Sequence, residues 1–152
     1  MNISQDFEEL FRILNAYKIK YLVVGAYAVI YYTEPRFTKD VDIWIIPDLN
    51  DPKKVYNALK QFGAPLRNVR PDNFLDRTMI LHIGIAPIRV DILMDVPGVT
   101  YQKAWRNRKR TRYGRTYISL LGMEELIQVK RRTGRIWVDA IASPKSVTRT
   151  TG

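Results

Sequence analysis

Four short apolar runs constrain the fold of this chain more than any other feature. They cover residues 21–24, 41–46, 79–85 and 88–94, and turn-forming residues such as Gly25, Pro47 and the pair Ala86-Pro87 bound them. Apolar runs of this length between turn residues are typical of strands that a packed sheet buries. The pair at 86–87 predicts a hairpin or a tight crossover between the last two strands.

Helical patterns alternate with these runs. Ser4 is suited to cap a first helix with an acidic first turn, and Asp51-Pro52 and Gly63 are suited to begin and end a third. The predicted helices cover 5–17, 26–32, 52–62 and 123–132, whereas 64–77 has no period and predicts a loop. We therefore expect an α+β (mixed α/β) fold, with a central mixed β-sheet flanked by helices, in one domain at 1–140 and a flexible tail at 141–152.

Composition excludes several kinds of site. The chain has no cysteine and one histidine, which excludes disulfides and thiolate metal sites and disfavours zinc. Any bound metal is expected to take oxygen ligands, as Mg²⁺ or Mn²⁺ does. No apolar run approaches the roughly 18 residues of a membrane span, and the N-terminus does not resemble a signal peptide. A cytoplasmic protein without membrane contacts is the expectation.

Two carboxylates stand at the start of the second apolar run. Strand periodicity places Asp40 and Asp42 on the same face as Trp44, and the intervening apolar residues on the other face. Neighbouring carboxylates at the edge of a core repel each other unless a cation joins them, which favours a divalent metal site. The alternative is that Asp40 is solvated and that Asp42 pairs with a basic side chain.

A third carboxylate, Asp91, lies inside the otherwise apolar strand at 88–94. Acidic residues in such strands rarely lack a partner. Arg89 shares its face and is one candidate partner; if the strand neighbours 41–46, Asp91 instead completes a three-carboxylate cluster. We expect His82, alone in a strand, to be a packed core histidine.

Gly25 joins a buried strand directly to a helix. Its backbone and the next amides then lie at a helix N-terminus, a geometry that binds phosphate. The alternative is that the glycine only makes a turn.

These segments resemble a known family. The stretches VGAYAVI at 24–30 and PRFTKDVDIW at 35–44, followed by Asp91, are similar to the nucleotidyltransferase superfamily that includes DNA polymerase β. The resemblance is strongest to AbiEii-type and related minimal nucleotidyltransferases. Ala26 stands where the family has a second glycine or a serine. A later stretch, LIQVK at 126–130 with Arg135 and Asp139, resembles the family's nucleotide-facing helix.

The resemblance implies a nucleotidyltransferase fold and transfer of an NMP from an NTP to a hydroxyl acceptor. Asp40, Asp42 and Asp91 would be the catalytic metal ligands for Mg²⁺ or Mn²⁺. The nucleotide-binding residues it implies are Gly25, Ala26, Arg36, Thr38 and Lys130. Arg36 can equally form a salt bridge to one of the aspartates.

The positive charge lies in the last third of the chain. Residues 1–100 hold 12 Lys/Arg and 12 Asp/Glu, whereas 101–152 hold 13 and 3, which gives the net charge of +10. In residues 101–117, seven Lys/Arg alternate with aromatic residues, a composition that suits an RNA or tRNA acceptor. The alternative is a basic loop with its aromatics packed inward, which we favour for Trp105 and Tyr117.

Three functions fit these patterns. The leading one is an NMP-transferring enzyme acting on RNA, tRNA or protein, such as the toxin of a toxin–antitoxin pair with an antitoxin partner. The second is a catalytically silent nucleotide- or RNA-binding protein with the same fold. The third, a transferase acting on small cationic molecules, would need an acidic acceptor cleft and is disfavoured by the basic C-terminal third.

Overall fold

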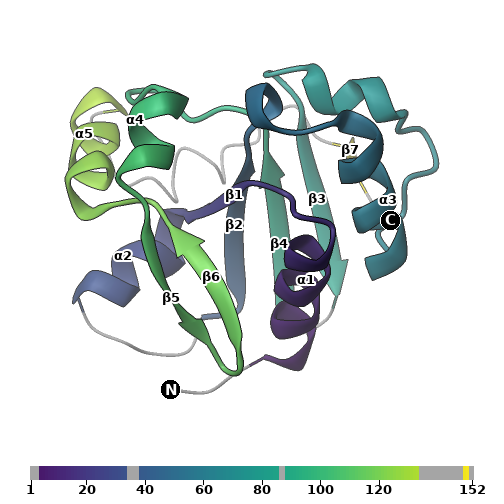
Figure 1. The fold of residues 1–152 in the computed structure, drawn as a ribbon, viewed down its shortest axis with the longest axis horizontal. Helices are drawn as coiled ribbons and strands as arrows, with labels where there is room; N and C mark the ends of the chain where they lie inside the picture. The colour runs from purple at the N-terminus through teal and green to yellow at the C-terminus, as the bar shows by residue number, and fades with distance from the viewer. Residues whose placement is uncertain (1–3, 34–37, 86–87, 134–148, 151–152) are drawn as a thin grey trace.

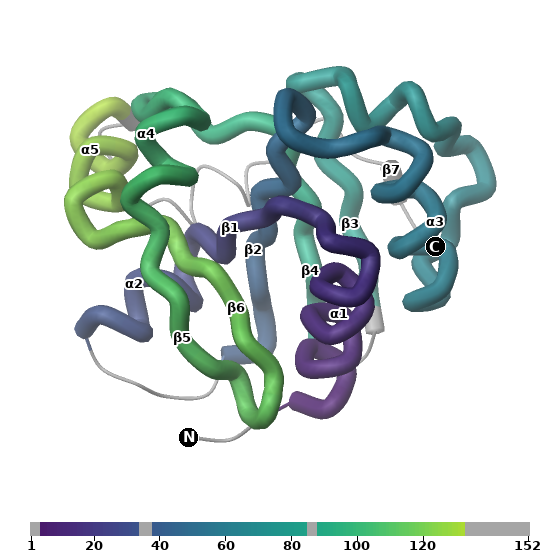
Figure 2. Tube along the Cα trace, in the orientation of Figure 1, coloured from purple at the N-terminus to yellow at the C-terminus, as the bar shows by residue number. Residues whose placement is uncertain are grey.

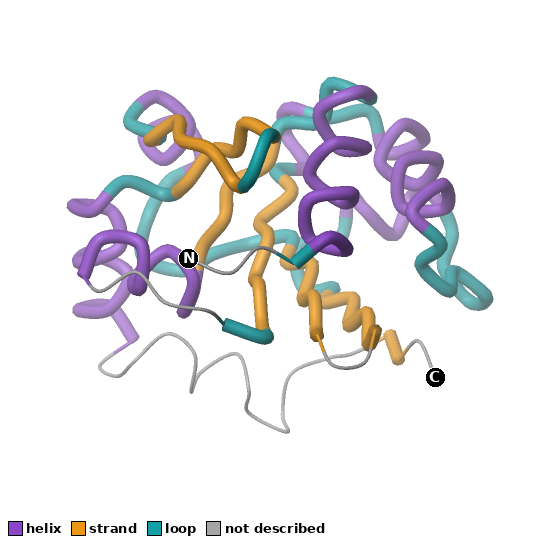
Figure 3. Tube along the Cα trace, turned by 90° about the horizontal axis from the view of Figure 1, so that it is seen from below, coloured by secondary structure: helices purple, strands orange, loops and turns teal. Residues whose placement is uncertain are grey.

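The computed structural model describes residues 4–33, 38–85, 88–133 and 149–150. They form a seven-stranded mixed sheet in the order β5-β6-β1-β2-β4-β3-β7, with helices on both faces (Figures 1 and 3). The strands are β1 (Tyr21–Val24), β2 (Asp40–Ile45), β3 (Ile80–Ile85), β4 (Ile88–Leu93), β5 (Lys109–Tyr113), β6 (Thr116–Leu120) and β7 (Arg149–Thr150). The helices are α1 (Gln5–Ala16), α2 (Gly25–Thr33), α3 (Pro52–Phe62), α4 (Tyr101–Arg106) and α5 (Met123–Thr133), with short 3-10 helices at Pro47–Leu49 and Pro71–Leu75. The predicted fold class is confirmed.

Local signals place the helix ends where the sequence predicts them. The Ser4 hydroxyl accepts a hydrogen bond from the Phe7 amide at 3.3 Å, and the Asp51 carboxylate accepts one from the Lys53 amide at 2.9 Å. Gly63 ends α3 with a φ of 98°, a left-handed conformation that glycine adopts without a Cβ clash.

Alternate residues of the strands separate the core into two halves. Val41, Ile43 and Ile45 of β2 pack with α1 and α3, whereas Trp44 packs on the opposite face, in the cluster that includes Val129 of α5 and Ala104 of α4. Asp42 therefore lies on the Trp44 face, as the strand periodicity predicts.

Two elements of the basic segment, α4 and β5, were not predicted from the sequence. Residues 101–106 form α4, and a β5–β6 hairpin turns at Gly114, whose φ is 62° (Figure 2). Helix α4 has one fully buried residue, Ala104, and β5 buries only Tyr113, so neither element leaves a clear apolar period in the sequence. The 3-10 turn at Pro71–Leu75 within the predicted loop was missed for the same reason.

Of the predicted tail at 141–152, the structure describes only Arg149 and Thr150, which pair with β3. The rest of that tail lies outside the described residues. Within the described part of the chain, no helix is long and apolar enough to cross a membrane.

Candidate active site

The candidate site lies where β1 ends and β2 begins. The two strands are antiparallel, and Val24, the last residue of β1, is the partner of Asp42. The next residue, Gly25, opens α2 with a φ of 70° and is buried. The predicted strand–glycine–helix junction is therefore present beside the acidic strand, with Ala26 in the first turn of the helix. Whether its amides bind phosphate stays a prediction.

A side chain at Gly25 is expected to strain the backbone. We expect Gly25→Ala to lower the free energy of unfolding by about 1–2 kcal/mol, the cost of a left-handed conformation for a residue with a Cβ. Urea denaturation measures this change. The control is Gly84→Ala, because a Cβ at Gly84 meets no atom within 4 Å and needs no left-handed backbone. Equal effects of the two substitutions would contradict this account of Gly25.

Asp42 and Asp91 are direct neighbours in the sheet. Strands β2 and β4 are parallel, and their register pairs Asp42 with Asp91. The residues are 4% and 5% exposed, and both lie on the Trp44 face. Burial raises the pKa of the Asp42 carboxyl well above its usual value, and the neighbouring Asp91 carboxylate raises it further. The sequence left the adjacency of these two strands open, and the register shows that they are neighbours.

The Asp91 carboxylate also has two side-chain partners, an arginine and a histidine. Arg89 Nε donates to its Oδ1 at 3.1 Å, so the ion pair considered in the sequence is formed. His82 Nδ1 is hydrogen-bonded to the same oxygen, because β3 pairs His82 directly opposite Asp91. The prediction of a merely packed core histidine was wrong: His82 belongs to the site. Only the strand register reveals this contact, since nine residues separate the two in sequence.

Asp40 lies nearer to the solvent. It is exposed at the first position of β2, and its charge is close enough to raise the pKa of Asp42. The Asp40 amide donates to the Thr38 hydroxyl at 3.3 Å, and that hydroxyl lies equally far from the Asp40 carbonyl, so Thr38 fixes the start of the strand. Arg36 lies outside the described residues. Lys130 is exposed in the last turn of α5, a helix that contacts α2.

The carboxylates of this site are of the type that binds a divalent cation, although they are not yet arranged around one position. Two buried carboxylates side by side, with a third on the same face of β2, supply the oxygen ligands that Mg²⁺ and Mn²⁺ prefer. A cation between them would also remove the repulsion that raises the pKa of Asp42. In the described part of the chain, however, no three Asp, Glu, His or Cys side chains already stand together as a metal-binding group.

Aromatic and basic side chains of residues 101–117 lie away from the candidate active site. Tyr113 packs in the core, whereas Trp105 is half-buried and Tyr117 is 50% exposed on β6. The expectation that Tyr117 packs inward was therefore wrong. Both rings lie against arginine side chains near the start of β1, at the end opposite to Gly25.

Comparison with known proteins identifies the fold. No protein-family model matches the chain, and no curated protein sequence matches it. The crystal structure of a Thermotoga maritima protein with a provisional assignment as a nucleotidyltransferase matches with a TM-score of 0.56 and 17% identity, over 84% of this chain and 82% of that one. At that identity the likeness shows the fold, which is of the nucleotidyltransferase type. The closer relation to AbiEii-type proteins stays a prediction.

Proposed function

We propose that this chain is a Mg²⁺-dependent nucleotidyltransferase that moves an NMP from an NTP to a hydroxyl acceptor. The observation that carries the proposal is the side-by-side placement of Asp42 and Asp91, both buried, next to the strand end where Gly25 opens α2. A protein rarely keeps two adjacent buried carboxylates without a function, because their repulsion and desolvation destabilise the fold.

Each site residue has a role in this proposal. Asp40 and Asp42 would hold Mg²⁺ against the triphosphate, and Asp91 would help to hold a second ion. The amides of Gly25 and Ala26 bind the β- and γ-phosphates at the start of α2, where the helix dipole favours anions. Lys130, Arg36 and Thr38 are assigned to the nucleotide through the family resemblance.

The transfer balances as one displacement at phosphorus. The acceptor hydroxyl oxygen forms a bond to the α-phosphorus, the bond from that phosphorus to the β-phosphate oxygen breaks, and pyrophosphate leaves. The hydroxyl proton passes to solvent. Bound Mg²⁺ supplies charge neutralisation of the phosphates and lowers the pKa of the acceptor hydroxyl.

Transfer of label tests this function directly. The full chain is incubated with each α-labelled NTP and Mg²⁺, with total RNA in one arm and host protein extract in another. Label on RNA or on protein supports the proposal and identifies the acceptor class. A toxin role, an antitoxin partner and a cytoplasmic location stay predictions that this assay does not need.

His82 is proposed as a positioning residue for Asp91. We expect His82→Leu to raise the Mg²⁺ concentration for half-maximal transfer by about 10–100-fold, as loss of a hydrogen-bond partner of a metal ligand does. His82→Asn, whose amide nitrogen can replace Nδ1, should recover most of that affinity. A fall in activity without a change in Mg²⁺ dependence would show that His82 has only a structural role.

A second function is favoured by one observation. Asp91 already pairs with Arg89 and His82, so this carboxylate has partners without a metal. This arrangement suits a catalytically silent protein that binds nucleotides or RNA. Binding of an NTP by the wild-type chain, without label transfer to any acceptor in the assay above, would favour this function.

A further inference from the structure

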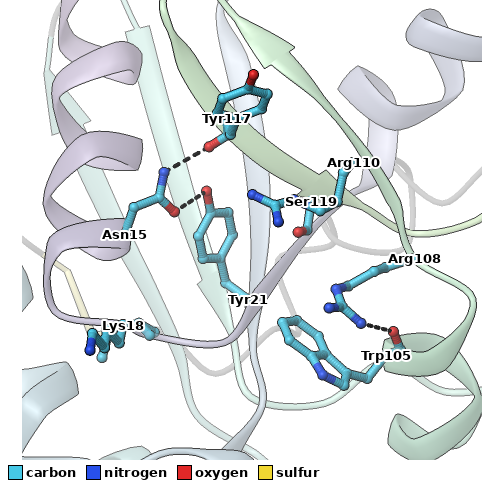
Figure 4. A pocket seen from close by; sticks show the side chains of 9 residues that line it. Asn15, Lys18, Tyr21, Trp105, Arg108, Arg110, Tyr117 and Ser119 are labelled. Carbon is cyan, nitrogen blue, oxygen red and sulfur yellow. Dashed lines mark hydrogen bonds between the residues drawn. The ribbon is translucent and has the colours of Figure 1, made fainter.

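A second site lies at the other end of β1. The parallel strands β1 and β6 pair at Val23 and Leu120, and the space beside Tyr21, toward the start of β1, is a pocket of about 390 Å³ (Figure 4). Asn15 at the end of α1 bridges the two strands. Its Nδ2 donates to the Tyr117 carbonyl at 2.7 Å, and its Oδ1 accepts from the Tyr21 hydroxyl at 3.1 Å. The volume is within the range of about 300–1,000 Å³ that small-ligand sites occupy.

The pocket concentrates positive charge without compensation. Lys18, Arg108 and Arg110 line it, and no acidic side chain does. In the described part of the chain none of these three side chains forms an ion pair. A pocket lined by cations and by no acidic side chain favours an anionic ligand.

Aromatic rings accompany the cations. The Arg108 guanidinium carbon lies 3.9 Å from the centre of the Trp105 ring, and its Nη1 donates to the Trp105 carbonyl at 2.7 Å. The Tyr117 ring is flanked by Arg112 at 4.8 Å and Arg110 at 5.5 Å and is half exposed. Cations beside exposed aromatic faces are the combination with which proteins hold the phosphates and bases of single strands.

The backbone at Lys18 adds an independent argument. Lys18 has a φ of 57°, and the amide of the following residue, Ile19, donates to the Leu14 carbonyl at 2.9 Å. Lys18 therefore occupies the position after the end of α1 that glycine normally takes. A lysine there costs stability relative to glycine. The chain thus keeps a lysine with a left-handed backbone at the edge of the pocket.

We propose that this pocket binds one nucleotide unit of a single-stranded nucleic acid. Arg108 and Arg110 hold the phosphate, Lys18 attracts the strand at the edge of the pocket, and the base stacks on the exposed ring of Tyr117. The site is separate from the Asp42–Asp91 pair, because β1 runs from Tyr21 at the pocket to Val24 beside Asp42. If the bound nucleic acid is the RNA that accepts the NMP, this inference deepens the proposed function and rests on it. Binding of nucleic acid in the pocket does not depend on the proposed function.

Binding of a labelled single-stranded RNA, followed by fluorescence anisotropy at several salt concentrations without NTP or Mg²⁺, tests the pocket. We expect Arg110→Gln to weaken binding about 5–10-fold and to reduce the salt slope by roughly 0.7, the value for one lost phosphate contact on a single strand. Tyr117→Leu is expected to weaken binding about 10-fold with the slope unchanged. Because neither NTP nor Mg²⁺ is present, failure here and failure of the transfer reaction are separate results.

Lys18→Gly separates binding from folding. It is expected to raise the melting temperature, because glycine relieves the left-handed backbone, and yet to weaken RNA binding about 5–10-fold. The control is Arg70→Gln, which removes an exposed arginine outside the pocket. Equal losses in Arg70→Gln and Arg110→Gln would overturn the proposal in favour of diffuse charge attraction. Competition by free AMP with the affinity of the RNA would overturn it in favour of a mononucleotide site.

Discussion

Asp42→Asn and Asp91→Asn are each expected to reduce NMP transfer about 1000-fold or more. Each substitution removes a negative oxygen from the proposed metal site, and loss of one preorganised electrostatic contact alone costs about 100- to 1000-fold. The loss should appear in the rate at saturating NTP, because the contact acts on the transition state. Single-turnover label transfer measures it.

The matched control for this loss is Asp72→Asn. Asp72 is an exposed aspartate in a surface ion pair with Arg70, outside the candidate site. Its substitution is expected to leave the transfer rate within about twofold, since exposed ion pairs contribute little. Transfer that persists in both Asp42→Asn and Asp91→Asn would contradict the proposed mechanism.

The second large effect concerns stability without metal. The pKa of Asp42 is raised above its ordinary value of 3.8 in the folded chain. At a pH between these two pKa values the folded chain keeps the Asp42 proton, whereas the unfolded chain has released it. The free energy of unfolding therefore falls as the pH rises from about 4 through the raised pKa. Asp91 and Asp40 reinforce this shift, whereas Arg89 opposes it. Asn at position 42 carries no charge and removes this destabilisation.

We accordingly expect metal-free Asp42→Asn to be more stable than wild type at pH 8. The difference should shrink toward pH 4. Mg²⁺ should then stabilise wild type but not the variant. Urea denaturation in EDTA and in excess Mg²⁺, across this pH range, measures all three effects. A variant that is less stable than wild type at every pH would show that the Asp42 carboxylate is paired and stabilising.

The sequence predicts which residues of a strand share a face of the sheet better than it predicts which strands are neighbours. The alternation of side chains alone places Asp42 on the Trp44 face, and Asp91 on the face of its strand that points away from Val90 and Ile92. The structure agrees. Adjacency of β2 and β4 was a condition in that argument, because no local signal determines which strands pair.

The parts that sequence reasoning missed depend on such pairing. His82 reaches Asp91 only because the β3–β4 hairpin has one particular register, in which the two residues are opposite. The pocket beside Tyr21 needs α1, α4, β1 and the β5–β6 hairpin to meet, and Lys18 carries no sign in the sequence that its backbone is left-handed. A polyanion partner stays a prediction from the charge composition, which does not show where the charges gather.

Anomalous diffraction from crystals soaked with Mn²⁺ and a non-hydrolysable NTP shows whether Asp42 and Asp91 bind metal. We expect Mn²⁺ peaks bound by the Asp42 and Asp91 carboxylates, roughly 3.5–4 Å apart where two ions bind, with the triphosphate at the start of α2. We also expect Asp91 to lose its direct contact with Arg89. Nucleotide bound with no Mn²⁺ at this pair, and with Asp91 still held by Arg89, would contradict the proposed mechanism.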